Sequence, residues 1–256
     1  MAMYERITSV QNEYIKQLCR LNSAAGRKES GLFLIEGQKV CAEAIQCQWP
    51  IERCLITERA MQTFDLSSFT GTIIEISEQV AKKLSSMDTS PGIFLVARQK
   101  NEPAADMPKF VLALDHLSDP SNLGAILRSA EAFGAQTVFL SEGCVDLYSP
   151  KTIRAAMGSA FRVHTQKGDL NAFISKQKEQ GYQILGAGLN RNFLTLQEVS
   201  FDTPTVLIIG NESNGITNEI VDQCDRGVFI PMQGNNESLN AAVAASIILW
   251  EQAKWK

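Results

Sequence analysis

Short runs of apolar residues, separated by polar turns, recur along the chain. In the first hundred residues these runs are rich in β-branched and aromatic side chains and alternate with helical patterns around 40–45 and 80–84. The strands predicted in this part are 33–35, 54–56, 73–76 and 93–96. The pattern predicts a small α/β module.

After residue 109 the strand-like runs are continuously apolar. They predict strands at 110–114, 137–140, 183–186 and 206–209, with helical patterns between them. Strands that are apolar on both faces belong to a sheet covered on both sides, so we expect a mainly parallel, doubly wound sheet. Ligands of such sheets bind beyond the carboxyl ends of the strands.

A polar stretch separates the two patterns. Residues 98–109 contain two prolines and five charged residues without a periodic apolar pattern, so we expect one domain over 1–100 and another over 106–256. Near the end of the chain, 239–250 is apolar on nearly all sides and rich in alanine. This segment predicts a helix buried in a core or in a dimer interface.

Composition fits a globular α/β protein, since 45% of the 256 residues are hydrophobic and 20% are charged. No apolar run approaches the ~20 residues that span a bilayer. The N-terminus lacks an apolar signal core, so we expect a cytoplasmic protein. The six cysteines form no CxxC pair and have no histidine at zinc spacing, which favours reduced structural thiols and no metal site.

The formal net charge of −4 is not that of a strongly basic nucleic-acid binder. Between Asp146 and Asp169, however, the chain has no acidic residue, while Lys151, Arg154 and Arg162 are basic. This segment is a candidate phosphate surface, and a solvated strand and helix edge is the other interpretation.

Three polar clusters lie at the ends of apolar runs. The first, at 119–128, opens a helix: Pro120 suits a helix start, Asn122 is a good cap, and an apolar stripe follows. Arg128 points away from that stripe, where an arginine is either functional or simply solvated. The second cluster follows the strand 206–209, with Gly210 allowing close approach to the backbone and Glu212 at the mouth of the sheet, or in a plain polar turn.

The third cluster leads into the apolar helix at 239–250. Ser238 suits the N-cap of that helix, whereas the amide of Asn240, inside the apolar run, has no purely structural account. Other chemistries are weakly supported, because Gly186 and Gly188 begin an incomplete dinucleotide fingerprint and there is no G-x-S-x-G or G-x-x-x-x-G-K-[ST] sequence. Of the two histidines, His116 is interpreted as a strand-end residue rather than a base.

Together the clusters resemble the three motifs of the SpoU (TrmH-like) family of RNA ribose 2'-O-methyltransferases, in the SPOUT superfamily. The resemblance covers about 106–256 and rests on Asp-Pro-x-Asn-x-Gly-x-x-x-Arg, Gly-x-Glu-x-x-Gly and Ile-Pro-Met with Ser-Leu-Asn, in the family's order. The N-terminal segment, most clearly at 33–40 and 43–45, resembles the family's substrate-binding module, which is similar in fold to a class of RNA-binding ribosomal proteins.

This resemblance implies a deep trefoil knot, an S-adenosylmethionine (AdoMet) site in the knot, and a homodimer. The cofactor would be held largely by backbone groups at Gly210, Ile230 and Leu239, with Leu207 and Met232 as neighbours. The implied catalytic set is Asn122, Arg128, Glu212, Ser238 and Asn240. Arg128 would orient the phosphate and the 2'-hydroxyl rather than act as a base, because guanidinium rarely loses its proton.

The implied activity is methylation of a ribose 2'-hydroxyl in structured RNA, with rRNA favoured over tRNA because of the N-terminal module. The expected RNA contacts are Lys151, Arg154, Arg162 and, in that module, Lys39. A non-catalytic RNA-binding or ribosome-associated protein that keeps the fold is the alternative, and a nucleotide-dependent oxidoreductase is a third hypothesis.

Overall fold

The computed structural model describes residues 5–101, 106–188, 194–234 and 238–255. Its chain forms two compact units: the first comprises Met1–Lys100 and Asp146–Phe161, and the second Asn101–Val145 and Arg162–Lys256. The predicted functional domains, 1–100 and 106–256, assign the segment Asp146–Phe161 differently, and they stay a prediction.

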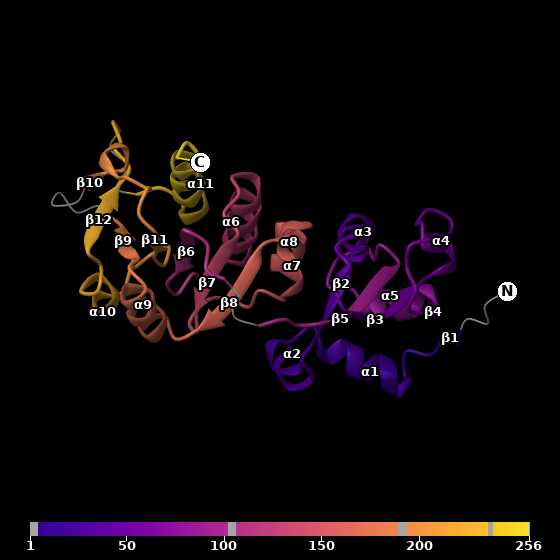
Figure 1. The fold of residues 1–256 in the computed structure, drawn as a ribbon. Coiled ribbons are helices and arrows are strands. Elements are labelled where there is room, and N and C mark those ends of the chain that lie inside the picture. Colours follow the sequence, from indigo (N-terminus) through magenta and orange to yellow (C-terminus); the bar gives the residue numbers. More distant parts are fainter. Residues whose placement is uncertain (1–4, 102–105, 189–193, 235–237, 256) are drawn as a thin grey trace. The chain divides into compact units, whose positions relative to one another are not determined.

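The first unit contains a mixed five-stranded sheet in the order β1-β4-β3-β5-β2 (Figure 1). Its strands are β1 (Glu5–Ile7), β2 (Leu32–Glu36), β3 (Ile51–Ile56), β4 (Thr72–Ile76) and β5 (Ile93–Arg98). Its helices are α1 (Glu13–Arg20), α2 (Ala24–Ser30), α3 (Gln38–Gln46), α4 (Glu58–Met61), α5 (Glu78–Leu84) and α7 (Pro150–Ala156). β4 pairs in parallel with β1 and β3, whereas β5 is antiparallel to β3 and β2. The predicted α/β module is confirmed.

The segment Asp146–Phe161 is held in the first unit by buried contacts. Arg27 is only 4% exposed, and its guanidinium lies 2.6 Å from the Asp146 carboxylate. The rings of Phe33 and Tyr148 pack with centroids 4.5 Å apart. Because an unpaired buried charge is strongly destabilising, the Arg27–Asp146 pair ties this distant segment to the sheet.

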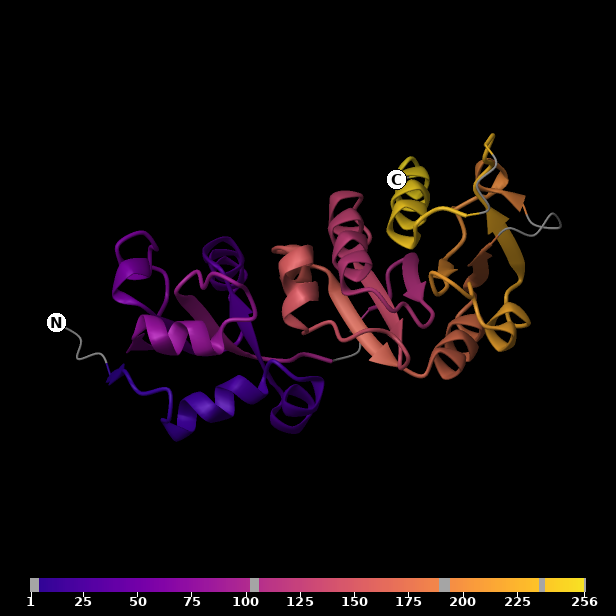
Figure 2. The same cartoon turned by 180° about the vertical axis from the view of Figure 1, so that it is seen from behind.

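The second unit contains a seven-stranded sheet in the order β10-β12-β9-β11-β6-β7-β8, and every pair in it is parallel (Figures 1 and 2). Its strands are β6 (Phe110–Leu114), β7 (Thr137–Ser141), β8 (His164–Gly168), β9 (Gln183–Ala187), β10 (Leu194–Thr195), β11 (Thr205–Ile209) and β12 (Arg226–Phe229). Its helices are α6 (Pro120–Ala132), α9 (Leu170–Glu179), η1 (Leu196–Glu198), α10 (Asn218–Val221) and α11 (Ala241–Ala253). The boundary between Phe161 of the first unit and Arg162 of the second lies within α8 (Ser159–Arg162).

Helices cover both faces of this sheet. Val111 and Ala113 of β6 share a buried cluster with Phe173 of α9 and Ile220 of α10. Successive side chains of a strand point to opposite faces, so the neighbouring residues of β6 face the layer of α6 and α11. The predicted parallel, doubly wound sheet is confirmed.

The register of the central strands determines where the polar clusters meet. Leu114, the last residue of β6, pairs with Ile209, the last residue of β11. The backbone N–H of Asp115 then donates to the carbonyl of Ile209 at 2.8 Å. The first two clusters therefore start side by side at the carboxyl edge of the sheet.

Candidate active site

The first cluster forms the N-terminus of α6. Asp119 is its N-cap, and the side chain of Asp119 accepts hydrogen bonds from the backbone N–H groups of Ser121 and Asn122. The prediction that Asn122 caps this helix is wrong, because Pro120 takes the first helical position and the residue before it takes the cap. Asn122 lies inside the first turn, and its side chain is available for contacts elsewhere.

Glu212, from the second cluster, is the centre of a hydrogen-bond network. Its carboxylate accepts from the N–H and the hydroxyl of Ser118 at 3.1 and 2.8 Å, and from the N–H of Asp119 at 3.0 Å. It also accepts from Nδ2 of Asn122 at 2.9 Å. Backbone and side chain of the first cluster are thus fixed by one residue of the second. Ser118 was missed by sequence reasoning, because neither its type nor its spacing marks it.

These contacts determine the charge of Glu212. Partial burial alone would raise the pKa of its carboxyl, but the hydrogen bonds from Asn122, from its own backbone N–H and from Ser118 lower the pKa to about 2. Glu212 is consequently a carboxylate at neutral pH, and with so many donors on its oxygens it is a poor proton acceptor. It holds the site together rather than taking a proton.

Asn240 adds the third cluster to the network. It is the N-cap of α11, where its Oδ1 accepts from the N–H groups of Ala242 and Val243 at 2.9 and 3.3 Å. Its Nδ2 donates to Oδ1 of Asn122 at 3.0 Å. The expectation that Ser238 caps this helix is wrong, and Asn240, which had no structural account from the sequence, combines the cap with the link to Asn122.

Arg128 lies on the exposed side of α6, while Leu123, Ile126 and Leu127 of the same helix are buried. This arrangement agrees with the predicted direction of Arg128. Its guanidinium has no hydrogen bond or ion pair to any residue that the structure describes. No described contact joins Arg128 or Ser238 to the network of Asn122, Glu212 and Asn240.

The residues expected to hold a cofactor come from the ends of β11 and β12 and the start of α11. Leu207 and Gly210 are buried, whereas Ile230, Met232 and Leu239 are partly exposed. A Cβ at Gly210 would lie 2.0 Å from the carbonyl carbon of Gly215, so only glycine allows this loop to close.

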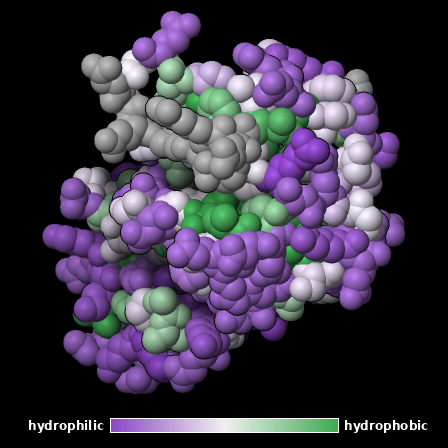
Figure 3. All heavy atoms as spheres, turned by 90° about the vertical axis from the view of Figure 1, so that its left-hand side faces the viewer, coloured by the Kyte–Doolittle hydropathy of each residue, from purple (hydrophilic) through white to green (hydrophobic). Residues whose placement is uncertain are grey.

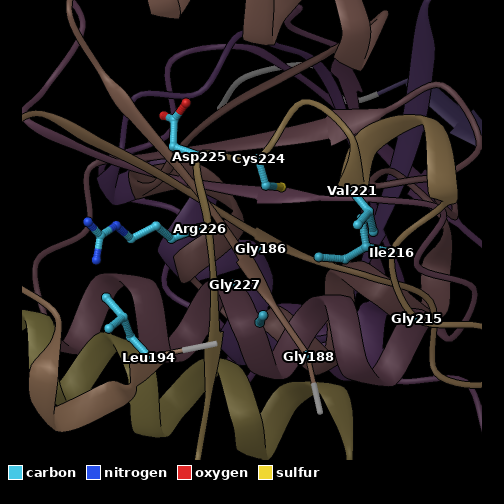
Figure 4. Close-up of a pocket in the computed structure, with 11 residues that line it drawn as sticks. Gly186, Gly188, Leu194, Gly215, Ile216, Val221, Cys224, Asp225, Arg226 and Gly227 are labelled. Atoms are coloured by element: carbon cyan, nitrogen blue, oxygen red, sulfur yellow. The ribbon is translucent and has the colours of Figure 1, made fainter. Parts of the chain in front are cut away.

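Beside that loop lies a pocket of about 570 Å³, drawn in Figure 4. Its walls include Gly186 and Gly188 at the end of β9, Gly215 and Ile216 of the second cluster, and Arg226 of β12. Figure 3, which views the molecule from the side on the left of Figure 1, shows apolar residues among hydrophilic ones. None of the five expected cofactor residues lines this pocket, although Gly215 connects it to Gly210. In the sequence, the two glycines near the end of β9 were the signal that could have indicated this pocket.

The basic residues expected to contact RNA have different surroundings. Lys39 of α3 and Lys151 of α7 are exposed. Arg154 is half-buried and donates to the hydroxyl of Ser86 at 2.6 Å, and Arg162 is paired with the carboxylate of Glu131. Their role in RNA binding stays a prediction, and contact with phosphate would have to compete with these partners.

The described residues contain neither a metal-binding cluster nor a helix suited to a membrane. No group of three or more His, Cys, Asp or Glu side chains in the described ranges has the arrangement to hold a metal ion. Within those same ranges, no helix is both long and apolar enough to cross a membrane.

Comparison with known proteins agrees with this geometry. The model of the SpoU rRNA Methylase family matches residues 109–250, and that of an MRM3-like substrate binding domain matches 12–95. A parallel sheet with the three polar clusters joined by hydrogen bonds is the arrangement expected of an α/β methyltransferase domain of this kind. The chain belongs to the SpoU rRNA Methylase family.

Similar proteins match over almost their whole length. The 23S rRNA (guanosine(2553)-2'-O)-methyltransferase of Bacillus subtilis is 30% identical over 96% of this chain and 98% of its own. A 23S rRNA (uridine(2479)-2'-O)-methyltransferase of Streptomyces viridochromogenes is 28% identical over 97% and 92%. The structure of an AdoMet-bound rRNA methyltransferase from Sinorhizobium meliloti aligns with a TM-score of 0.87 at 27% identity, over 98% of both chains.

Proposed function

We propose that this chain is an AdoMet-dependent RNA ribose 2'-O-methyltransferase that acts on rRNA. The observation that carries the proposal is the hydrogen-bonded network of Asn122, Glu212 and Asn240, which joins all three family motifs at one edge of the sheet. The activities of the two similar enzymes, both 23S rRNA 2'-O-methyltransferases, support the substrate class.

The residues at the ends of β11 and β12 fit a bound AdoMet. Gly210 lets the loop after β11 close against Gly215, and Ile230, Met232 and Leu239 offer partly exposed apolar surface and backbone groups. When bound, AdoMet supplies a methyl group on a positively charged sulfur. Two similar solved structures, from Sinorhizobium meliloti and Streptomyces viridochromogenes, contain this cofactor.

The chain's own residues orient the nucleophile. Arg128 binds the phosphate of the target nucleotide and places its 2'-oxygen in line for displacement, since alignment supplies much of the rate in such reactions. The guanidinium also stabilises negative charge that develops on that oxygen. Glu212 and Asn122 keep the loop before α6 in one conformation, and neither Glu212 nor Arg128 serves as the base.

The proposal includes a homodimer formed through α6 and α11. Their shared outer surface is a shallow apolar depression, lined by Ala125, Ala242, Val243, Ser246, Ile247 and Trp250. Val243 is 48% exposed and Trp250 is 55% exposed, which is unusual for neighbouring large apolar residues. The two helices are joined beneath it by the hydroxyls of Ser129 and Ser246, 2.7 Å apart.

A trefoil knot at the C-terminal end of the chain is also part of the proposal. It rests on membership of the family, whose members are knotted, and on the sheet order in which β9 and β12 lie on the far side of β11 from β6. Refolding kinetics test it, since a chain that must thread a loop is expected to refold slowly even when no proline or disulfide step limits the rate.

The experiment is transfer of tritiated methyl groups from AdoMet to purified rRNA and tRNA that lack modifications. Label in rRNA supports the proposal, and label confined to tRNA contradicts its substrate. The alternative, a non-catalytic RNA-binding protein, predicts RNA binding without AdoMet binding, and isothermal calorimetry with AdoMet decides between the two.

A further inference from the structure

His116 has an unusual backbone and an exposed ring. It follows β6, and its φ of 54° lies in the left-handed region, which residues other than glycine adopt only in a few per cent of cases, with asparagine, aspartate and histidine the commonest among them. Its side chain is 55% exposed. A strained residue with an exposed polar ring at the edge of an active site points to a use beyond the turn itself.

The direction of this ring is fixed by a buried carboxylate. Asp115 is 1% exposed; its Oδ1 lies 2.7 Å from Nδ1 of His116, and its Oδ2 accepts from the N–H of Thr217 at 2.9 Å. The ring lies over Gly143, where a Cβ would come within 2.1 Å of the ring carbon Cδ2. Three separate loops therefore hold the imidazole in one orientation.

This arrangement leaves one nitrogen for a partner. A carboxylate only accepts hydrogen bonds, so Nδ1 carries the proton that points to Asp115. In the neutral imidazole Nε2 then keeps its lone pair, and no described residue donates to it. Glu212, whose oxygens are occupied by Ser118, Asp119 and Asn122, offers no comparable open acceptor.

His116 is also coupled directly to the motif network. Its carbonyl oxygen accepts from Nδ2 of Asn211 at 2.8 Å, and Asn211 precedes Glu212. Two residues after His116, Ser118 donates to Glu212. The ring thus extends the site from β11 and β6 towards the loop after β7, where Gly143 lies.

We propose that His116 is a substrate-positioning residue whose Nε2 accepts a hydrogen bond from a donor group of the RNA beside the methylated nucleotide. This inference rests on the proposed function. Two RNA groups have the required chemistry: a ribose 2'-hydroxyl and a base amino or imino group. Phosphates, which only accept hydrogen bonds, do not fit Nε2 of the neutral imidazole.

The first test compares His116→Asn and His116→Gly with the wild type in methyl-transfer assays. Asparagine keeps the left-handed backbone and a donor to Asp115 but does not reach the position of Nε2, and glycine removes the ring. The asparagine variant is expected to melt at or above the wild-type temperature, because the strain is relieved and a donor to Asp115 is kept. The glycine variant also loses that donor to a buried carboxylate, so its melting temperature is expected to be lower than that of the asparagine variant. We expect kcat/KM for RNA to fall about 3- to 10-fold, through KM, with AdoMet affinity unchanged.

The assays distinguish a failure of the proposed function from a failure of the proposed role of His116. If the wild type transfers no methyl group to any RNA, the proposed function fails. If the wild type is active and His116→Asn has the wild-type KM for RNA, the role of His116 fails. Gly143→Ala, which pushes the intact ring aside, is expected to raise the KM in the same way without altering the chemistry of residue 116.

The second test identifies the donor. RNA fragments with single 2'-deoxy substitutions, or with single bases that lack one amino or imino donor, such as inosine in place of guanosine, are assayed with the wild type and with His116→Asn. One substitution is expected to weaken the wild type but not the variant, and its type distinguishes ribose from base. If every substitution weakens both proteins equally, Nε2 accepts no hydrogen bond from the RNA.

Discussion

Nδ2 of Asn240 donates to Oδ1 of Asn122, a residue 118 positions earlier in the chain. The direction of this bond is fixed at both ends. Oδ1 of Asn240 is engaged in capping α11, which leaves only Nδ2 for Asn122. Asn122 accepts with its oxygen and therefore turns its own Nδ2 to Glu212, at 2.9 Å. A helix cap is thus coupled to the carboxylate that orders the loop before α6.

Asn240→Asp separates the cap from that coupling. Aspartate caps helices as well as asparagine does, so the free energy of unfolding is expected to change by about 1 kcal/mol or less. The donor to Asn122 is lost, and methyl transfer is expected to fall at least about tenfold. Denaturant unfolding and initial rates measure the two effects. Asn240→Ala is the control, since it loses both contacts; equal activity of wild type and Asn240→Asp would show that the coupling has no catalytic use.

Arg128→Ala tests the exposed guanidinium on α6. No described contact is lost, so the melting temperature and AdoMet affinity are expected to stay at wild-type values. Methyl transfer is expected to fall by about 10²- to 10³-fold, the usual effect of removing one charge-stabilising donor. Arg128→Lys keeps the charge without the planar fork and should be intermediate. Activity in Arg128→Ala close to that of the wild type would place Arg128 outside the site.

The carboxylate of Glu212 makes a pH-dependent contribution to stability. Its pKa in the folded chain is about 2, below the ordinary value of 4.5. The contribution is therefore fully present above the ordinary value and is lost as pH falls through the folded pKa. The stability difference between wild type and Glu212→Gln is expected to be constant from pH 7 to 5 and to shrink from pH 4.5 towards 2. Urea unfolding across this range measures it, and a difference that does not vary with pH would contradict the assignment.

Val243→Glu tests the apolar surface of α11. Because Val243 is 48% exposed, a charge there should leave the fold of a single chain intact. We expect the variant to be monomeric by light scattering, with a melting temperature that no longer rises with protein concentration. Val221→Glu, at an exposed apolar residue of α10, is the matched control and should stay dimeric. A wild type that is itself monomeric at micromolar concentration would refute the dimer.

The parallel sheet was predictable because its buried strands are apolar on both faces. Short, continuously apolar runs of this kind are typical of sheets covered by helices on both sides. β8 was not predicted, since its sequence His-Thr-Gln-Lys-Gly has no apolar pattern; it lies at the edge of the sheet, where partial exposure permits polar residues. The packing of Asp146–Phe161 with the first unit was equally hidden. It depends on ion pairs such as that of Arg27 with Asp146, which no local sequence pattern predicts.

The residue types of the candidate site were predictable from the motifs, but their local roles were not. Asp119 and Asn122 are both good caps by residue type, and only the position of Pro120 decides between them. Asn240 was recognised as exceptional within an apolar run, yet its double use depends on α11 beginning at Ala241 next to α6. The left-handed conformation of His116 likewise accompanies backbone hydrogen bonds to Ser141 and Asn211, which are distant in the sequence.

The proposed ribose methylation is tested by identifying the nucleoside that the enzyme modifies. Unmodified rRNA is incubated with isotopically labelled AdoMet and either wild type or Arg128→Ala, digested to nucleosides, and analysed by mass spectrometry. With the wild type we expect a labelled methyl group on the ribose of one nucleoside, and that methyl group also makes the adjacent phosphodiester resistant to alkali. With Arg128→Ala we expect almost no labelled nucleoside. A label on a base, or equal labelling by both proteins, would contradict the proposal.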